Sequence, residues 1–324
     1  MAALLMILPN REYYRWQQGD GAILFRARYV YERIHYDPRP IDVAMVGSSR
    51  MEASVRVNEL SEGLSRKLGR QVSVVNFGLP QEGRDLQWAV VEQLLSNRSE
   101  VKLIVLSAGA ESTLSHPGFR FLGDDASIVG APAFYNPYYL ENLLTLPYRR
   151  LAYFVQGLWP EAFQLSPSFD RIIHQKRAFD PAESFRMPNG ELIERERVLD
   201  PSRIEAQRRA IAETRKHDPK LRYLGLDQRY AIERSYLRKI ARLTKEKGVD
   251  VAFLRVPVYQ GADEQIDDRK FYTSLGPILE PVQLAGDYRH YMDAGHLNRT
   301  GTAALSPWLV EQLTQLLLKA ERNN

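Results

Sequence analysis

Two short stretches near opposite ends of the chain carry side chains suited to nucleophilic chemistry. In the first, an apolar run at residues 43–46 ends in Gly47-Ser48-Ser49-Arg50, and a helical pattern begins directly afterwards. A strand, a tight turn and a helix place one hydroxyl at the carboxyl end of a sheet, beside the free N–H groups of a helix start. Such a serine can attack a carbonyl group. A serine that only caps a helix has the same local sequence.

The second stretch, residues 291–310, holds Asp293 and His296 just before a long amphipathic pattern. Two residues three positions apart can lie on one loop. The carboxylate can then hold one nitrogen of the imidazole and leave the other nitrogen for Ser49. The two stretches together are therefore compatible with a Ser-His-Asp arrangement assembled from opposite ends of the chain.

These stretches resemble blocks of the SGNH/GDSL hydrolase-like superfamily, and the resemblance covers roughly residues 42–112 and 248–318. Its most specific part is the run Asp-x-x-His-Leu-Asn-x-x-Gly from residue 293, while Ser48 departs from the commoner Gly-Asp-Ser. The resemblance implies Ser49 as nucleophile, His296 as base and Asp293 as the residue that orients the imidazole. Among relatives, the chain looks most like the envelope-associated branch that acts on exopolysaccharides or teichoic acids.

The middle blocks of that family supply oxyanion donors. Residues 75–78, Val-Asn-Phe-Gly, resemble the second block, whose glycine offers a backbone N–H, although a plain glycine at a strand end reads the same way. The third block is normally Gly-x-Asn, but here Glu111 stands at the Asn position, and an ionised carboxylate cannot donate a hydrogen bond. The residues expected around the oxyanion and substrate are Gly78, Glu111, Ser48, Arg50 and Asn76.

Composition indicates a globular protein without a cofactor signature. The 324 residues are 44% hydrophobic and 26% charged, with a net charge of +4 and no cysteine. Basic and acidic residues are interleaved, and no nucleic-acid motif, phosphate loop or dinucleotide fingerprint is present. The absence of cysteine excludes disulfides and thiolate metal sites. Four histidines lack a partner at metal-ligand spacing, so packing or surface roles are expected for His35, His116, His174 and His217.

The N-terminal 40 residues have two interpretations. The apolar stretch at residues 2–9 is too short to span a bilayer and lacks the features of a signal peptide. It is either the end of a membrane tether that lies upstream of residue 1 or the start of an ordinary helix. The aromatic residues between 11 and 35 suit a membrane interface, and equally a helix that packs on the domain. With the resemblance, this predicts an extracytoplasmic location, periplasmic or membrane-anchored; a cytoplasmic location is the alternative.

Alternating strand and helix patterns predict an α/β fold, a three-layer α/β/α sandwich with a central parallel sheet. Strands are expected at residues 43–46, 72–76, 103–106 and 249–256, and helices at 51–68, 84–95, 228–247 and 300–319. The SGNH-like domain would comprise residues 41–112 and 227–324, after an N-terminal segment at 1–40. Residues 113–226 would form an inserted cap, rich in aromatic residues near 131–160, with an Asn-Gly hairpin at 189–190 and a charged helix at 204–216.

The expected function is serine-dependent acyl-ester chemistry, as an esterase or O-acetyltransferase that adds or removes acetyl groups on a cell-envelope or exported polysaccharide. One partner that the resemblance suggests is a membrane-bound acyl donor protein; a nucleic-acid partner is not expected. The alternative is a catalytically weak SGNH-fold subunit for binding or assembly in polysaccharide modification or export. Glu111 favours the alternative, and the complete set Ser49, Asp293 and His296 favours the enzyme.

Overall fold

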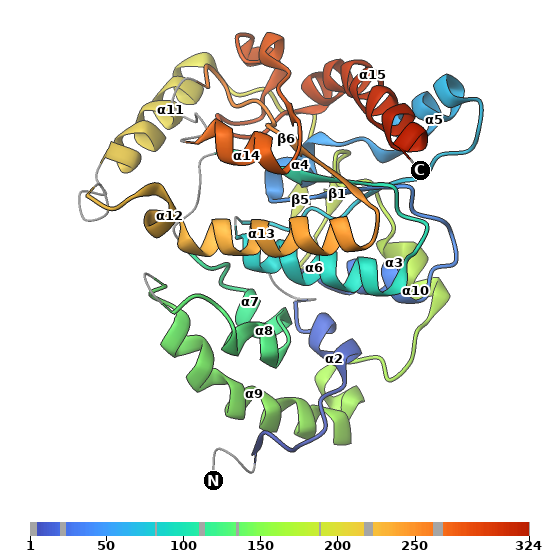
Figure 1. The fold of residues 1–324 in the computed structure, drawn as a ribbon, viewed down its shortest axis with the longest axis vertical. Helices are drawn as coiled ribbons and strands as arrows, with labels where there is room; N and C mark the ends of the chain where they lie inside the picture. The colour runs from blue at the N-terminus through green and yellow to red at the C-terminus, as the bar shows by residue number, and fades with distance from the viewer. Residues whose placement is uncertain are drawn as a thin grey trace.

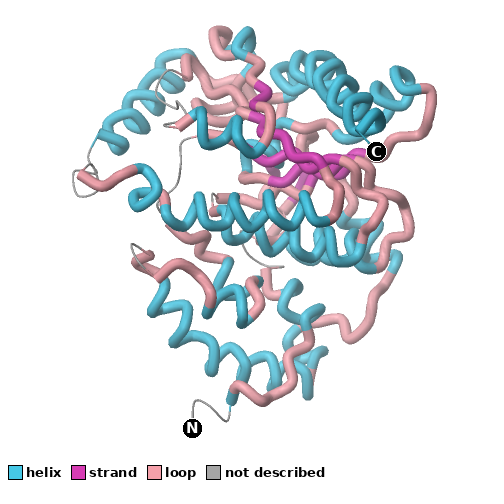
Figure 2. The backbone as a smooth tube through the Cα atoms, in the orientation of Figure 1, coloured by secondary structure: helices cyan, strands magenta, loops and turns pink. Residues whose placement is uncertain are grey.

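The fold is built on a five-stranded parallel sheet, as predicted (Figures 1 and 2). The computed structural model describes residues 5–19, 24–81, 83–109, 114–133, 136–187, 189–216, 223–261 and 268–323. In the sheet, the strand order is β2-β1-β3-β6-β7. The strand bounds are Val43–Val46 for β1, Val74–Asn76 for β2, Leu103–Ser107 for β3, Asp250–Leu254 for β6 and Ile278–Leu279 for β7.

Helices cover both faces of this sheet, which explains why the strands are almost uniformly apolar. On one face, Val43 and Met45 of β1 point into a core shared with α5 (Val57–Leu68) and α15 (Arg299–Asn323). On the other face, Ala44 and Val46 pack with α3 (Ala27–His35), α6 (Arg84–Asn97) and α13 (Ala231–Glu246). The α/β/α sandwich expected from the sequence is therefore present.

Several element boundaries differ from the prediction. The helix expected at residues 51–68 is two helices, α4 (Ser49–Ser54) and α5, separated at residues 55–56. A short α12 (Leu226–Arg229) precedes α13, and both α14 (Arg269–Leu275) and the two-residue strand β7 were not predicted. A strand of two residues is too short to show a hydrophobic period. Asp268 accepts a hydrogen bond from the Phe271 N–H and begins α14, as expected of a helix start.

The long interruption packs at several separate places. The helices α7 (Phe119–Leu122), α8 (Asp125–Val129) and α9 (Tyr139–Leu158) share a core with α13. Next, α10 (Arg171–Arg177) contacts α3. The predicted hairpin is formed by β4 (Phe185–Arg186) and β5 (Leu192–Ile193), which pair antiparallel, and α11 (Pro201–Lys216) follows it. Figure 1 shows α9 at the edge of the molecule, away from the sheet.

The N-terminal aromatic residues pack against the domain. In α2 (Glu12–Gln17), Tyr14 and Trp16 are buried, and Tyr31 of α3 stacks on Tyr13 with 5.7 Å between ring centroids. These contacts fit the second interpretation of this stretch, in which a helix packs on the domain. Among the helices that the structure describes, none combines the length and the apolar character needed to cross a bilayer.

Candidate active site

Ser49, His296 and Asp293 form one hydrogen-bonded chain at the carboxyl end of the sheet. Ser49 Oγ lies 2.9 Å from His296 Nε2, and His296 Nδ1 lies 3.0 Å from each carboxylate oxygen of Asp293. A carboxylate next to Nδ1 fixes the tautomer in which Nδ1 carries the proton, so Nε2 can accept the proton of the serine. The predicted hydrogen-bond distance between Ser49 and His296 is confirmed, while the roles of the three residues in a reaction stay predictions.

The turn at residues 47–49 needs glycine at its first position. A Cβ atom on Gly47 would lie 2.7 Å from both the Met51 Cβ and the Ser107 Cβ, closer than side chains approach one another. Without a side chain, residue 47 fits between Met51 and Ser107. The buried Ser48 follows it, and Ser49 is the first residue of α4. The N–H of Ser49 is one of the first amides of α4, which no carbonyl of that helix accepts.

The loop that carries Asp293 and His296 is fixed by residues of the run that begins at Asp293 and by residues just before it. Tyr291 and Leu297 form an antiparallel bridge, and both side chains are buried. The two ends of the loop are therefore held next to each other. Buried Asn298 donates to the Arg289 carbonyl at 2.8 Å and accepts from the Gly301 N–H at 3.0 Å, which joins the loop to the start of α15. The Leu-Asn-x-x-Gly sequence after His296 is thus explained by positioning.

The electrostatics of this loop favour an ionised Asp293. Burial opposes ionisation, but hydrogen bonds from His296 and from the Gly295 N–H hold the pKa of Asp293 below its ordinary value. From α11, the Gln207 side chain accepts a hydrogen bond from the Ala294 N–H at 3.1 Å. The inserted segment therefore helps to hold the loop that carries the imidazole.

The residues of the second block hold hydrogen bonds within the fold. Asn76 is buried, and its amide donates to the carbonyls of Met51 and Glu52 at 3.1 Å each, so it satisfies the C-terminal end of α4. Its side-chain oxygen accepts the Gly78 N–H at 2.9 Å. The described contacts of Asn76 thus lie within the fold and not toward a substrate. The Gly78 N–H already has an acceptor, so its use as an oxyanion donor requires that this bond be shared or broken.

Three charged side chains beneath the site escaped prediction. Arg26 donates to the carbonyls of Asn76 and Gly78, at 3.1 and 3.2 Å, and lies 3.7 Å from the Glu52 carboxylate. Burial raises the pKa of Glu52, against the opposing charges of Arg26 and Arg195. Burial also lowers the pKa of Arg195, and the negative charges of Glu52 and Asp293 oppose this lowering. Nothing in the local sequence marks these residues, because three separate segments bring them together.

The third block lies mostly outside the described residues. Residues 110–113, which include Glu111, are among those the structure does not describe, so the expected position of Glu111 is neither supported nor opposed. At its edge, Ala108 N–H donates to the Leu254 carbonyl at 2.8 Å. The Arg50 guanidinium lies between Gly109 and Gly295: Nη1 is 3.9 Å from where a Cβ on Gly109 would lie, and Nε is 3.7 Å from the same point on Gly295.

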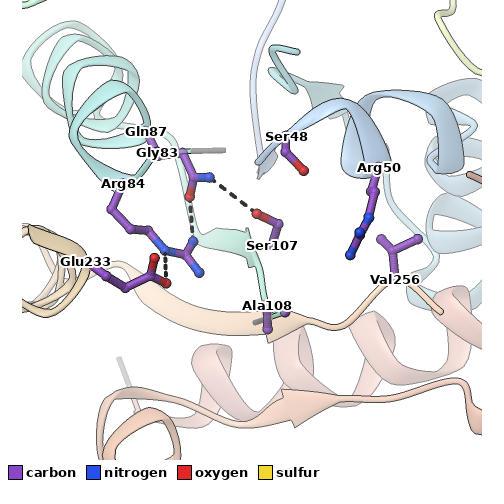
Figure 3. A pocket seen from close by; sticks show the side chains of 10 residues that line it. Ser48, Arg50, Gly83, Arg84, Gln87, Ser107, Ala108, Glu233 and Val256 are labelled. Carbon is purple, nitrogen blue, oxygen red and sulfur yellow. Dashed lines mark hydrogen bonds and ion pairs between the residues drawn. The ribbon is translucent and has the colours of Figure 1, made fainter. Parts of the chain in front are cut away.

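A cavity of about 30 Å³ adjoins the serine turn (Figure 3). Ser48 just before α4, Arg50 of α4 and Ser107 at the end of β3 face it. Its far wall is a hydrogen-bonded chain in which Gln87 donates to Ser107 Oγ at 3.3 Å and Arg84 donates to Gln87 at 2.5 Å. Glu233 of α13 then accepts from Arg84 Nε at 2.8 Å. The predicted residues Ser48 and Arg50 thus flank this cavity, on either side of Ser49.

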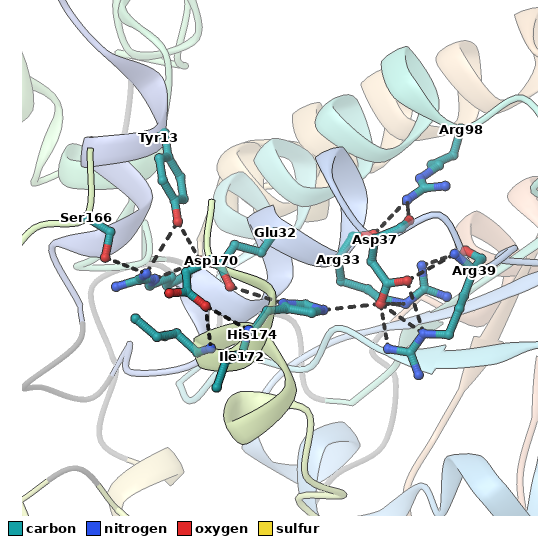
Figure 4. A network of polar contacts seen from close by, with 12 residues as sticks. Tyr13, Glu32, Arg33, Asp37, Arg39, Arg98, Ser166, Asp170, Ile172 and His174 are labelled. Carbon is teal, nitrogen blue, oxygen red and sulfur yellow. Dashed lines mark hydrogen bonds and ion pairs between the residues drawn. The ribbon is translucent and has the colours of Figure 1, made fainter. Parts of the chain in front are cut away.

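The side chains of three other histidines have partners within the fold. Buried His174 lies between two carboxylates, with Nδ1 3.0 Å from Glu32 and Nε2 3.1 Å from Asp37 (Figure 4). His35 contacts Gln93 and His116 contacts the Pro80 carbonyl, as expected of packing roles, while His217 lies outside the described residues. Among the residues with described positions, no three acidic or histidine side chains gather closely enough to hold a metal ion.

Comparisons with known proteins add no family to this geometry. A scan against protein-family models finds no match to the chain, and a search of curated proteins finds no relative.

Proposed function

We propose that this protein carries out serine-dependent acyl-ester chemistry with Ser49, His296 and Asp293. One observation carries the proposal: a serine at a strand-to-helix turn within 2.9 Å of an imidazole whose other nitrogen faces a carboxylate. Each contact is the one required by its role in nucleophilic catalysis. The resemblance of both loops to SGNH/GDSL hydrolase-like blocks also supports serine-dependent acyl-ester chemistry.

In the proposed reaction, Ser49 Oγ attacks the acyl carbonyl while His296 Nε2 takes the hydroxyl proton. The carbonyl oxygen becomes an oxyanion beside the Ser49 N–H at the start of α4. When the ester bond breaks, His296 returns the proton to the departing alkoxide, and the acyl group stays on Ser49. Water or a sugar hydroxyl then loses its proton to His296, attacks the acyl group and restores the free serine.

The proposed substrate is an O-acetylated cell-envelope or exported polysaccharide. The choice of an acetyl group rests on the family resemblance. The choice of a glycan, an extracytoplasmic location and a membrane-bound acyl donor partner rest on the family resemblance. Fractionation of the native host tests the location, and recovery in the cytosol would contradict it.

A fluorophosphonate probe, which forms a covalent bond with activated serines, tests the nucleophile. We expect the wild-type protein to be labelled and Ser49→Ala to lose labelling. Ser48→Ala is the matched control, and its labelling should persist. Labelling that survives Ser49→Ala would assign the reactive hydroxyl to another serine.

A catalytically weak subunit for polysaccharide binding or assembly is the second candidate. The observation that favours it is the hydrogen bond from the Gly78 N–H to Asn76, which occupies one expected oxyanion donor. If no Ser49-dependent turnover appears with a range of acyl donors and sugar acceptors while a glycan still binds, this second candidate becomes the better one.

A further inference from the structure

The long helix α9 buries apolar residues such as Leu146 on its inner side and exposes a second set of apolar side chains on its outer side. Its outward side chains recur at helical spacing and include Leu140, Leu144 and Tyr148, which are 65%, 62% and 72% exposed. The series continues past the end of the helix through η1 (Pro160–Phe163). We call this series the α9 ridge: Leu140, Leu144, Tyr148, Leu151, Leu158, Trp159 and Phe163. An ordinary surface helix is polar on its outer side, whereas the outer side of α9 is largely apolar.

Polar contacts on the inner side hold α9 in this rotation. Buried Arg149 donates to the Arg120 carbonyl at 2.6 Å and also pairs with Asp125 of α8. Arg150 contacts the same carboxylate, and Tyr153 donates to the Phe121 carbonyl at 3.1 Å. Rotating α9 to bury its leucines would break these bonds and leave buried charges unpaired, which is costly. The exposed ridge is therefore a fixed feature of the fold.

The first described residues of the chain meet the same end of the molecule (Figure 1). Arg150 of α9 donates to the Leu8 carbonyl at 3.1 Å, and Met6 packs against the core that includes Leu146 of α9. Ile7, between them, is 78% exposed. An apolar N-terminal stretch and the α9 ridge thus place exposed apolar side chains at one end of the protein.

We propose that the α9 ridge rests on the surface of a lipid bilayer, with its apolar side chains in the interface. The ridge is the outer surface of one helix at the edge of the molecule and not a groove that would receive a peptide. Tyr148 and Trp159 have the apolar body and polar tip that are enriched at membrane interfaces. This inference does not depend on the proposed reaction.

Charge indicates which lipid surface the ridge fits. Between residues 140 and 163 the only basic residues are Arg149 and Arg150, and both turn inward to Asp125. The acids Glu141 and Glu161 stand near the two ends. The ridge itself thus offers little exposed basic charge to anionic headgroups, so we expect burial of apolar surface to supply the binding. A zwitterionic bilayer is the expected surface.

Flotation of the full chain with phosphatidylcholine vesicles tests the proposal. We expect partition into the vesicle fraction that changes less than about twofold when salt rises from about 0.1 to about 0.5 M, because the contact is apolar. The double variant Leu144→Glu/Leu151→Glu should weaken partition by at least about tenfold. Ile172→Glu/Val282→Glu, which adds the same charges at exposed apolar positions outside the ridge, should bind within about twofold of wild type.

Parallel vesicles containing phosphatidylglycerol and sedimentation of the free protein distinguish the other outcomes. Binding only to the anionic vesicles, with loss in salt, would overturn the proposal in favour of a basic patch. Unchanged binding by the ridge variant, or no binding to either vesicle, would overturn it as well. Self-association that the ridge variant abolishes, without vesicle binding, would assign the ridge to a second copy of the chain.

Discussion

Ser48 and Ser49 are neighbours with different surroundings. Ser48 is buried, and its carbonyl accepts the Glu52 N–H at 3.0 Å, whereas the Ser49 hydroxyl reaches His296. Ser48 occupies the N-cap position of α4 without a capping hydrogen bond from its side chain, and the candidate nucleophile is the next residue. Sequence alone separates them only through the distant Asp-x-x-His run.

Replacing Asp293 tests whether the carboxylate acts through the imidazole. In Asp293→Asn the amide can donate toward His296 Nδ1 and stabilise the tautomer that cannot accept the serine proton. We expect kcat to fall by on the order of 10³- to 10⁴-fold with a small acetyl ester, while KM changes little. Asp287→Asn, an exposed aspartate of the same region paired with Arg289, is the control and should retain activity. Equal activity of both variants would remove Asp293 from the site.

Glu111 offers a second test at this scale, based on sequence alignment with the third block. If its carboxylate faces the oxyanion, Glu111→Asn should raise Ser49-dependent hydrolysis of an activated acetyl ester by about tenfold, or 1.4 kcal/mol of barrier. Hydrolysis by the Ser49→Ala/Glu111→Asn variant gives the background. An unchanged or lower rate would show that Glu111 is not a substitute for the missing donor.

At the scale of elements, the Asn76 side chain connects the end of β2 to α4 by hydrogen bonds. One side chain satisfies two carbonyls at the end of the helix and the N–H of Gly78 after the strand. A Cβ on Gly78 would lie 2.6 Å from the Glu52 nitrogen, so helix and strand end touch directly there. In a continuous helix the carbonyls of Met51 and Glu52 would accept from the amides of residues 55 and 56, where the predicted helix divides; here both accept from Asn76.

Removing the Asn76 side chain should lower both the stability and the activity of the protein. Asn76→Ala leaves several buried backbone groups without partners, so we expect the free energy of unfolding to fall by about 2–4 kcal/mol. Urea denaturation measures this change. Asn97→Ala, which removes an exposed amide that bonds the Gln93 carbonyl, should cost less than about 1 kcal/mol. A similar small loss in both variants would contradict a structural role for Asn76.

The sequence predicts the elements more completely than their junctions. The strands at 43–46 and 103–106 and the helix at 84–95 match β1, β3 and α6 within two residues, because long apolar patterns reflect burial on a sheet. The loop at residues 293–296 was found through its spacing. Arg26, Glu52, Arg195 and Gln207 were not, because their positions depend on tertiary contacts among distant segments.

At the scale of the whole molecule, the contact of α6 with α8 should be sensitive to pH. Burial, together with the neighbouring Asp124 carboxylate, raises the pKa of Glu92 to about 7. A carboxyl whose pKa is higher in the folded state binds its proton more tightly there. Ionisation of Glu92 therefore lowers the free energy of unfolding as pH rises from about 4.5 through about 7.

Glu92→Gln should remove that dependence. We expect the variant to be more stable than wild type by about 1 kcal/mol at pH 8, after the partial exposure of Glu92 is allowed for, and to differ less at pH 5. Thermal or urea unfolding at the two pH values measures the difference. A variant that is equally stabilised at both values would show that shape rather than charge is responsible.

The separation of Ser49 from His296 along the chain has a consequence for biosynthesis. The two residues are 247 positions apart, and the loop that carries the base is held by the start of α15, the last helix described. A nascent chain that has already made the serine turn cannot yet activate it. In the proposed mechanism, the hydroxyl therefore becomes reactive only after the C-terminal helix has been made and has docked.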